Sequence, residues 1–393
     1  MNPIRSVRMA QRFIAAEEAF QKAAQIMSTK VSIPVSGRYN ALYGEEDLHR
    51  SLIALSINNA FAESGMERLS VESSAASGRV PSGSWVRDTV EKVPEKEMQA
   101  MLAGALDSTL EQVKSFRLFN VPVMCAADLH DIPRYDRDSD RGYLRRSKKE
   151  RGTNIFEGYA TLQCVEEGMR AQISCDHIGL FDKKSVVLER LLVSARMEEV
   201  DISLLLLDRG FFGSSVINML KKLHQRFFMP CILTPGIKKA LQEYARGERK
   251  MISGYSLTPA EGEGASFTLV IFPRARCAPG ETNPCKRYIP FATNIPVGDI
   301  LWNVSRLPKD YRARWGIESG YVGVGELKAR TTSRNHSLRL LYFYYALILY
   351  NAWLIANLTL AKRYCILPLG EPLIRVEFVK GVFHRLKADS FRG

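Results

Sequence analysis

The cysteines of this chain form no metal-binding or redox motif. The seven cysteines are Cys125, Cys164, Cys175, Cys231, Cys277, Cys285 and Cys365. No two of them are separated by only two residues, which is the spacing that zinc ribbons and dithiol redox sites require. Scattered thiols of this kind are typical of buried or idle cysteines in a reducing cytoplasm. The N-terminal residues MNPIRSVRMAQRF also lack the apolar core of a signal peptide, which favours a cytoplasmic location.

Charge is missing from one long segment, residues 340–361. This segment is long enough to cross a bilayer. It also contains Asn351, Asn357, Thr359 and four tyrosines, and no other segment of the chain resembles it. Because a helix that is apolar on all sides is also found in the core of large proteins, we expect a buried helix here. A membrane span is the alternative.

Size and net charge restrict the class of protein. A chain of 393 residues is expected to form two or three domains. Its content of 46% hydrophobic and 25% charged residues argues against wholesale disorder. The formal net charge of +13 favours a polyanionic partner, either nucleic acid or an acidic membrane surface, and does not choose between them.

Residues 1–118 are predicted to be mainly helical. Helical patterns cover residues 8–27, 45–64 and 95–114, and Ser84 can cap a short helix that stops before Pro94. That short helix carries Arg87 and Lys92 and could serve as a recognition helix for DNA ends, with simple packing as the alternative.

The pattern changes at residue 119. Strands are expected at 121–128, 158–165, 169–176, 202–208 and 228–233, with helices at 185–199 and 212–226. The order β-β-β-α-β-α-β matches an RNase H-like fold, with three antiparallel strands followed by parallel ones. Residues 119–235 would therefore form the first part of such a core.

The later part of the chain interrupts the core and then completes it. Residues 236–300 read as a β-rich insertion, with strands at 251–257, 266–272 and 287–293. Helices at 308–328 and 338–360, within 301–361, would complete the core, and residues 362–393 form a tail. The predicted fold class is α/β: an RNase H-like catalytic core with a β-rich insertion, preceded by a mainly helical N-terminal domain.

Two aspartates follow apolar runs that are predicted to be neighbouring strands. Asp128 ends the run VPVMCAAD, and Asp208 ends the run ISLLLLD. Functional groups collect beyond the carboxyl ends of strands in open sheets, so the two carboxylates are expected side by side. Adjacent carboxylates repel one another unless a cation lies between them, and hard divalent cations such as Mg²⁺ prefer oxygen ligands. A third nearby carboxylate would complete a two-metal site.

The helix predicted at 311–328 can supply that third carboxylate. Tyr311, Arg314 and Glu318 have the spacing i, i+3 and i+7, which places them on one helical face. Taken alone, Arg314 and Glu318 are better explained as a surface ion pair, because such pairs are common on helices.

Four segments resemble the DDE insertion-sequence transposases of family four and their close relatives. The segment LLLLDRGFFG at 204–213 is similar to the second-Asp block of that family, and AADLHDIPRY at 126–135 is similar to the first. YRARWGIES at 311–319 resembles the Tyr–Arg–Glu part of the Tyr–Arg–Glu–Lys signature, and GTNIFEGYATL at 152–162 resembles the strand after the first Asp. The resemblance covers about residues 119–360 and includes the β-rich insertion. The lysine of the signature is expected at position 325, where this chain has Gly325, and Lys328 stands three residues later.

The resemblance implies a set of roles. Asp128, Asp208 and Glu318 would be the catalytic residues and would hold two Mg²⁺ ions, with Mn²⁺ as a substitute. Tyr311, Arg314 and Lys328 would contact DNA. The chain would then be a DNA transposase that cleaves phosphodiesters and transfers strands of an insertion sequence. Its partners would be double-stranded DNA, at element terminal inverted repeats and at a target, and a second copy in the DNA complex. It would use no membrane and would be nucleoid-associated in the cytoplasm of a prokaryotic host.

Other residues are weaker candidates. Asp131 and Asp176 could be misassigned acids, although solvated strand-end acids are the usual case, and His130 is more often structural than a metal ligand. The Arg- and Lys-rich loop 134–151 could contact the DNA backbone or remain solvated. Two tryptophans could stack on a flipped base, with buried packing expected instead: Trp302 and Trp315.

Two rival functions remain. An RNase H-like nuclease or resolvase would share the acids but would lack the Tyr311–Arg314–Glu318 helix after a β insertion. A non-enzymatic membrane-associated protein would use residues 340–361 as its anchor, and solubility without detergent distinguishes it.

Overall fold

The chain forms two compact units, each built from separate stretches of sequence. The computed structural model describes residues 9–35, 42–73, 80–135, 142–150, 152–258, 262–274, 276–303, 305–366, 371–379 and 381. One unit, here called the helical unit, contains residues 1–120, 167–175 and 318–393. The other, here called the sheet unit, contains residues 121–166 and 176–317.

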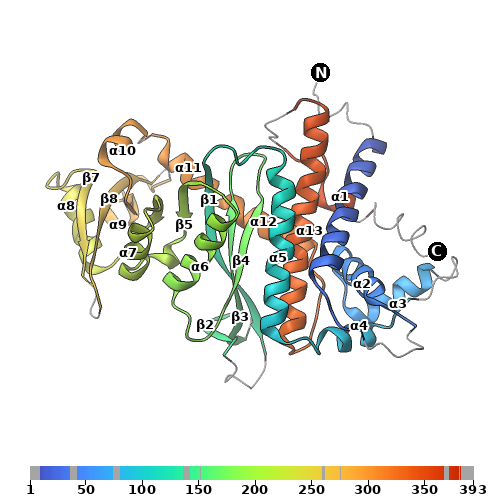
Figure 1. Cartoon of the computed structure of the whole chain (residues 1–393). Coiled ribbons are helices and arrows are strands. Elements are labelled where there is room, and N and C mark those ends of the chain that lie inside the picture. The colour runs from blue at the N-terminus through green and yellow to red at the C-terminus, as the bar shows by residue number, and fades with distance from the viewer. Residues whose placement is uncertain are drawn as a thin grey trace. The chain divides into compact units, whose positions relative to one another are not determined.

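One large mixed sheet dominates the fold (Figure 1). Its strands are β1 (Val123–Arg134), β2 (Arg145–Glu150), β3 (Thr153–Cys164), β4 (Gln172–Ile178), β5 (Ile202–Leu207), β6 (Phe227–Pro230), β7 (Ile252–Leu257), β8 (Ala265–Pro273) and β9 (Tyr288–Thr293). The strands follow the order β2-β3-β1-β5-β6-β9-β8-β7, and β4 also pairs with β3. The predicted strands are therefore present, and β2 is an additional strand in the segment that was expected to be a loop.

The sheet is parallel at its centre and antiparallel toward both ends of the strand order. β1 runs antiparallel to β3 and parallel to β5, and β5 runs parallel to β6. β9 then pairs antiparallel with β6, which joins the predicted insertion to the same sheet. β5 is buried at five of its six positions, as its continuous apolar sequence predicts for a central strand.

Helices connect the parallel strands of the sheet unit. α6 (Lys184–Met197) leads into β5, and α7 (Ser214–Lys222) leads from β5 toward β6. The buried residues of α6, which include Leu188, Leu191 and Leu192, recur at helical spacing. The insertion also contains α8 (Pro235–Ala245), α9 (Pro284–Arg287) and α10 (Val297–Asn303), so it is less purely β than predicted.

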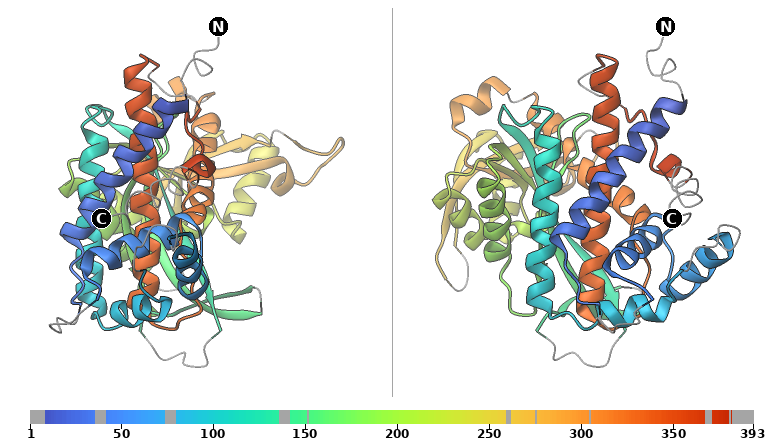
Figure 2. Two further views of the ribbon diagram at one scale, coloured as in Figure 1. Left: turned by 90° about the vertical axis from the view of Figure 1, so that its right-hand side faces the viewer. Right: turned by 45° about the vertical axis from the view of Figure 1, so that its right-hand side comes forward.

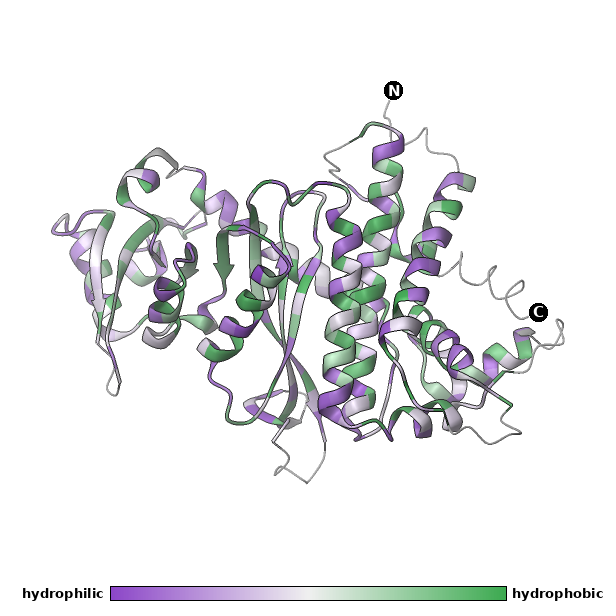
Figure 3. Cartoon of the chain, viewed as in Figure 1, coloured by the Kyte–Doolittle hydropathy of each residue, from purple (hydrophilic) through white to green (hydrophobic). Residues whose placement is uncertain are grey.

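A long buried helix forms the centre of the helical unit. α13 (His336–Arg363) lies beside α1 (Met9–Lys30) and α5 (Glu95–Lys114) in both views of Figure 2. It is the one helix among the described residues that is long and apolar enough to cross a membrane, and 89% of its most apolar window is buried within the structure. Figure 3 shows hydrophobic and neutral colours along most of its length. Burial of this segment is therefore confirmed.

The N-terminal helices differ from the prediction at residues 58–61, where one predicted helix is interrupted. The segment predicted as one helix over 45–64 is divided into α2 (Glu45–Ile57) and α3 (Ala62–Ser73). Asn59 lies between them with φ of 50°, a left-handed conformation that ends α2 and that asparagine tolerates better than most residues. The next helix, α4 (Gly83–Val90), is capped by Ser82 rather than Ser84, and the Ser82 side chain accepts from the Trp85 backbone N–H.

The helix predicted at 311–328 is two helices. α11 (Leu307–Ala313) ends before Arg314, and α12 (Trp315–Glu326) begins directly after it. At the junction, Arg314 N–H donates to the Tyr311 carbonyl and Ile317 N–H to the Arg314 carbonyl. These i to i−3 bonds are tighter than those of a regular α-helix, so the structure has two helices where the sequence predicted one. Lys328 lies beyond the end of α12.

Candidate carboxylate site

The pairing of β1 with β5 brings Asp128 and Asp208 to adjacent positions. The last pair in this parallel register is Ala127 with Leu207. The next residue after β1's Ala127 is Asp128, and the next residue after β5's Leu207 is Asp208. Asp208 continues the extended backbone of β5, with φ of −79° and ψ of 172°. Neighbouring strands lie about 4.8 Å apart, and in-register residues of parallel strands point to the same face. The two carboxylates therefore share one face of the sheet.

Asp128 does not end its strand, contrary to the prediction. β1 continues to Arg134 because β3 supplies an antiparallel partner along this whole stretch, from Asp128 opposite Thr161 to Arg134 opposite Ile155. Only the parallel partner β5 stops at this level. Asp128 therefore lies level with the carboxyl end of β5, although its own strand β1 continues and stays paired with β3.

A close turn follows Asp208. Residues Arg209–Phe211 form a short 3₁₀ helix, and a side chain at Gly210 would place its Cβ 3.0 Å from Asp208 Oδ1 and 3.2 Å from Oδ2. Lys184 Nζ donates to the Gly210 carbonyl at 2.6 Å. The absence of a side chain at position 210 therefore lets the turn close against the carboxylate. Gly210 therefore permits this tight turn for a steric reason.

Tyr311 attaches α11 to the carboxyl end of β5. Its hydroxyl donates to the Leu207 carbonyl at 3.4 Å, and its ring packs edge-on against Phe228 and Phe291. Burial raises the pKa of Tyr311, while the adjacent Arg314 opposes this rise and Asp208 adds to it. The Arg314 guanidinium carbon lies 5.8 Å from the centre of the Tyr311 ring. The chain thus returns after the insertion to place Tyr311 at the carboxyl end of β5, with Arg314 beside Tyr311.

The structure divides the predicted site residues between the two units. Asp128, Asp208, Tyr311 and Arg314 lie together in the sheet unit, as described above. Glu318 is the first residue of the last stretch of the helical unit, 318–393, and is exposed in the first turn of α12. Lys328 is half-buried in the helical unit, where its carbonyl accepts from Asn59 Nδ2 at 2.7 Å. The roles of all six predicted site residues remain predictions from the sequence.

A buried polar network lies on the same face of the sheet as Asp128. Arg134 Nη1 donates to Glu157 Oε2 at 3.1 Å, and both side chains are 0% exposed. The Tyr159 hydroxyl donates to Glu157 Oε1 at 3.0 Å. The even spacing of Asp128 and Arg134 along β1 puts them on one face. Arg134, which was counted with the cationic loop 134–151, is therefore a core residue.

Asp131 and Asp176 are bound to arginines rather than solvated. Asp131 lies on the opposite face of β1 from Asp128, 3.5 Å from Arg145, and burial raises its pKa although Arg145 opposes this. Asp176 is only 9% exposed and forms an ion pair with Arg190; burial is also the main cause of its raised pKa. Neither acid replaces Asp128 beside Asp208.

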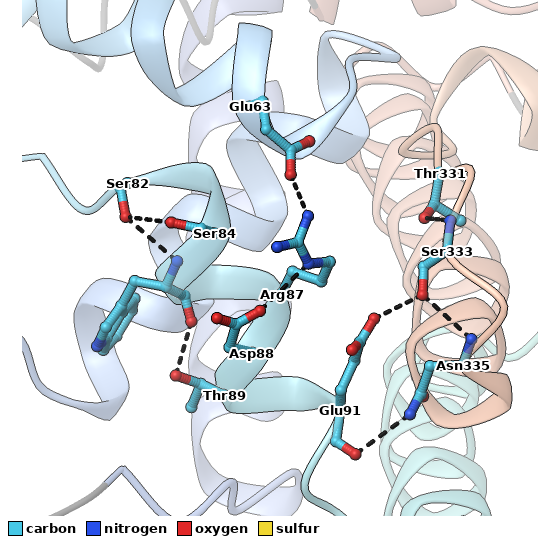
Figure 4. Close-up of polar contacts among 11 residues, drawn as sticks. Glu63, Ser82, Ser84, Arg87, Asp88, Thr89, Glu91, Thr331, Ser333 and Asn335 are labelled. Carbon is cyan, nitrogen blue, oxygen red and sulfur yellow. Dashed lines mark hydrogen bonds and ion pairs between the residues drawn. The ribbon is translucent and has the colours of Figure 1, made fainter.

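The short helix α4 is held by polar contacts within the helical unit (Figure 4). Arg87 points between Glu63 and Asp88 and forms ion pairs with both. Glu91 accepts from Ser333 Oγ at 2.5 Å, and its carbonyl accepts from Asn335 Nδ2 at 3.2 Å. These contacts tie α4 to the segment before α13. They engage Arg87, the one cation inside α4, and so favour packing over DNA recognition for this helix.

Trp315 is exposed, contrary to the expectation of buried packing. It directly follows Arg314, and 59% of its surface is accessible. The side chain of Trp302 lies outside the described part of the chain. Lys184 was not singled out from the sequence, because an isolated lysine in a helix gives no signal; only the fold shows its contact with the turn after Asp208.

Comparisons with known proteins give one kind of match. No protein-family model and no curated protein sequence matches the chain. Among solved structures, its fold is similar to that of piggyBac transposase in a synaptic complex with hairpin DNA, with a TM-score of 0.53 and 12% sequence identity. The alignment covers 96% of this chain and 78% of that chain. The chain is therefore a mixed α/β protein with a large sheet, and its fold is similar to that of a known transposase.

Proposed function

We propose that this chain is a DDE-type DNA transposase with an RNase H-like core. The observation that carries the proposal is the register that puts Asp128 and Asp208 side by side, with Tyr311 and Arg314 anchored at the end of β5. The order β4-β3-β1-β5-β6, antiparallel and then parallel, agrees with an RNase H-like core. The similarity of fold to a transposase supports the same function.

The donor set fits hard divalent cations. Two adjacent carboxylates on one face repel each other unless a cation compensates them, and oxygen ligands suit Mg²⁺ or Mn²⁺. Asp128 and Asp208 would hold the ions, and Glu318 in α12 would be the third carboxylate of a two-ion site. Such ions activate water and neutralise charge on a phosphodiester.

The surrounding residues would bind and orient DNA. The guanidinium of Arg314 can hold two phosphate oxygens in a fork, and the Tyr311 hydroxyl can orient one of them. Lys328 would add a point charge at flanking DNA. No side chain need form a covalent intermediate, because the freed 3′-hydroxyl of DNA serves as the nucleophile for strand transfer. Two DNA ends in one reaction imply a dimer on DNA.

The decisive experiment is cleavage of DNA that carries the element's own ends, with Mg²⁺ and with EDTA. Asp208→Asn should lower the cleavage rate roughly a thousandfold, because a ligand to ions that contribute several kcal/mol is lost. Its matched control is Asp201→Asn, an exposed acid at the other end of β5. DNA binding, measured by gel shift, should survive in both. Normal cleavage by Asp208→Asn would remove the carboxylate assignment.

A second pair of variants tests the helix that follows the insertion. Arg314→Ala should abolish end cleavage, whereas Arg312→Ala removes an exposed cation two residues earlier, at the end of α11. Cleaved ends that are never joined to a target would instead indicate an RNase H-like nuclease or resolvase.

A further inference from the structure

A small cationic cavity lies in the sheet unit beside β1. Its volume is about 200 Å³, and its lining includes Leu129, which lies on the same face of β1 as Asp131 and on the opposite face from Asp128. Three cations from two elements line it: Arg145 and Arg146 of β2, and Lys184 of α6. This volume is enough for one phosphate group with residual water.

Arg145 is placed by a missing side chain on the neighbouring strand. A Cβ at Gly158 would come within 2.5 Å of Arg145 Cδ, so the stem of Arg145 occupies the space above this glycine. Gly158 is the register partner of Asp131, and Arg145 Nε lies 3.5 Å from the Asp131 carboxylate. The stem of Arg145 therefore lies across β3, and the side chain is only 16% exposed.

The negative charges of the acids near the cavity are already neutralised by ion pairs with arginines. Asp182, which also lines it, forms an ion pair with Arg190 at 3.3 Å and accepts from the Gly179 N–H at 2.8 Å. Asp131 is paired with Arg145. Arg146 and Lys184 thus leave the cavity with an excess of positive charge, which favours an anion.

We propose that this cavity binds one phosphodiester group of the DNA backbone. The proposal rests on the proposed function, because that function makes DNA the substrate. Guanidinium groups bind phosphate oxygens in a fork, and Lys184 supplies a mobile point charge. Since Lys184 also donates to Gly210, in the turn that closes on Asp208, a phosphate held here would be tied to the carboxylate site.

The first test uses inorganic phosphate and the full-length chain. Melting temperatures are measured at rising phosphate concentration and constant ionic strength for the wild type and for two double variants. Arg145→Gln/Arg146→Gln removes two cavity cations, and Lys148→Gln/Lys149→Gln removes two exposed cations of the same strand. Phosphate should raise the melting temperature of the wild type and the Lys variant, because a bound ligand stabilises the folded state, and not that of the Arg variant. An equal response of all three proteins would overturn the site.

Gly158→Ala provides a variant that keeps every charge. Its methyl group occupies the space of the Arg145 stem and should weaken the response to phosphate while the chain still melts cooperatively in phosphate-free buffer. A full response to phosphate in Gly158→Ala would contradict the role of Arg145.

The second test uses DNA. The slope of log affinity against log salt should fall by about 1 in the Arg145→Gln/Arg146→Gln variant, as expected for one lost phosphate contact. Substituting methylphosphonates one at a time should reveal one phosphate whose neutralisation weakens wild-type binding several-fold and has no further effect on the Arg variant. No such phosphate, or equal losses in both double variants, would reject a DNA anchor.

The outcomes separate this inference from the proposed function. A protein that responds to phosphate through Arg145 and Arg146 but never cleaves DNA keeps the anion site and loses the transposase assignment. A protein that cleaves DNA without any cavity-specific response keeps its function and loses this anchor.

Discussion

The two units bury polar groups in different ways. The sheet unit encloses a charged pair, Arg134 with Glu157, on the face that carries Asp128. The helical unit encloses neutral groups. His49 Nδ1 lies 2.5 Å from the Tyr345 hydroxyl. Asn351 accepts from the Gln172 backbone N–H at 2.9 Å and donates to the Gln172 carbonyl at 3.0 Å. Charge in a dry interior carries a large desolvation cost, whereas satisfied neutral groups specify geometry at little cost. The cost of buried charge is thus concentrated in the unit that carries the aspartates.

The largest expected effect comes from breaking the charged pair. Glu157→Leu should lower the free energy of unfolding by about 3–5 kcal/mol, because Arg134 is left buried without its partner carboxylate. Replacing both residues, as Arg134→Met/Glu157→Leu, should recover most of the loss. Hydrogen exchange of β3 amides reports on this unit specifically. If Glu157→Leu were as stable as the wild type, the buried charge would carry no such cost and the two units would not differ in this respect.

An intermediate effect is expected where α12 packs in the helical unit. A Cβ at Gly323 would lie 2.8 Å from the ring of Tyr350, so Gly323→Ala should destabilise by about 1–3 kcal/mol through overpacking. Gly325→Ala, two residues later in the same helix, meets nothing within 4 Å and should stabilise by about 0.5–1 kcal/mol. Denaturant unfolding of the two variants measures the difference. Equal changes in the free energy of unfolding, in the same direction for both variants, would mean that close packing against Tyr350 does not limit the stability of this unit.

The smallest effect concerns pH. Burial lowers the pKa of His49 below 6.5, and the nearby Glu45 only partly opposes this. The unfolded chain therefore binds the proton more readily, so stability should fall as pH decreases from about 6.5 toward the lower folded pKa. His49→Gln should remove that part of the pH dependence. Unfolding measured across this range in both proteins checks it, and identical pH profiles would argue that His49 is not held neutral.

The periodicity of apolar residues predicted most helices and strands, because burial on one face determines both the apolar pattern and the position of each element. The run at 202–208 became β5, and the pattern at 95–114 became α5 with those same bounds. The segment at 340–361 was assigned to the core partly because of Asn351 and Asn357. Both prove to bind backbone groups, and Asn357 accepts from the Ile374 N–H at 2.7 Å.

Other features depended on interactions that a local pattern does not contain. β2 has the sequence RRSKKE, with no apolar alternation, and it is a strand only because β3 pairs with it. The break at Arg314 lies inside a sequence of uniform helical character. Trp315 was expected to be buried from its apolar area alone.

The candidate site was predictable in part. The two apolar runs identified Asp128 and Asp208, and the strand order that makes them neighbours followed from the predicted topology. The contact of Lys184 with the Gly210 carbonyl and the return of Tyr311 to Leu207 across the insertion are long-range contacts. The spacing of residues along the chain could not have revealed them.

The composition of β2 has a consequence for solubility. β2 lies at one end of the strand order, where unpaired backbone groups of a sheet can recruit a strand from another molecule. Its exposed Arg146, Lys148 and Lys149 place like charges where two such edges would meet. These cations therefore oppose the edge-to-edge pairing of two copies of the chain. Neutralising all of them together should shift the protein from a stable solution toward β-sheet aggregates.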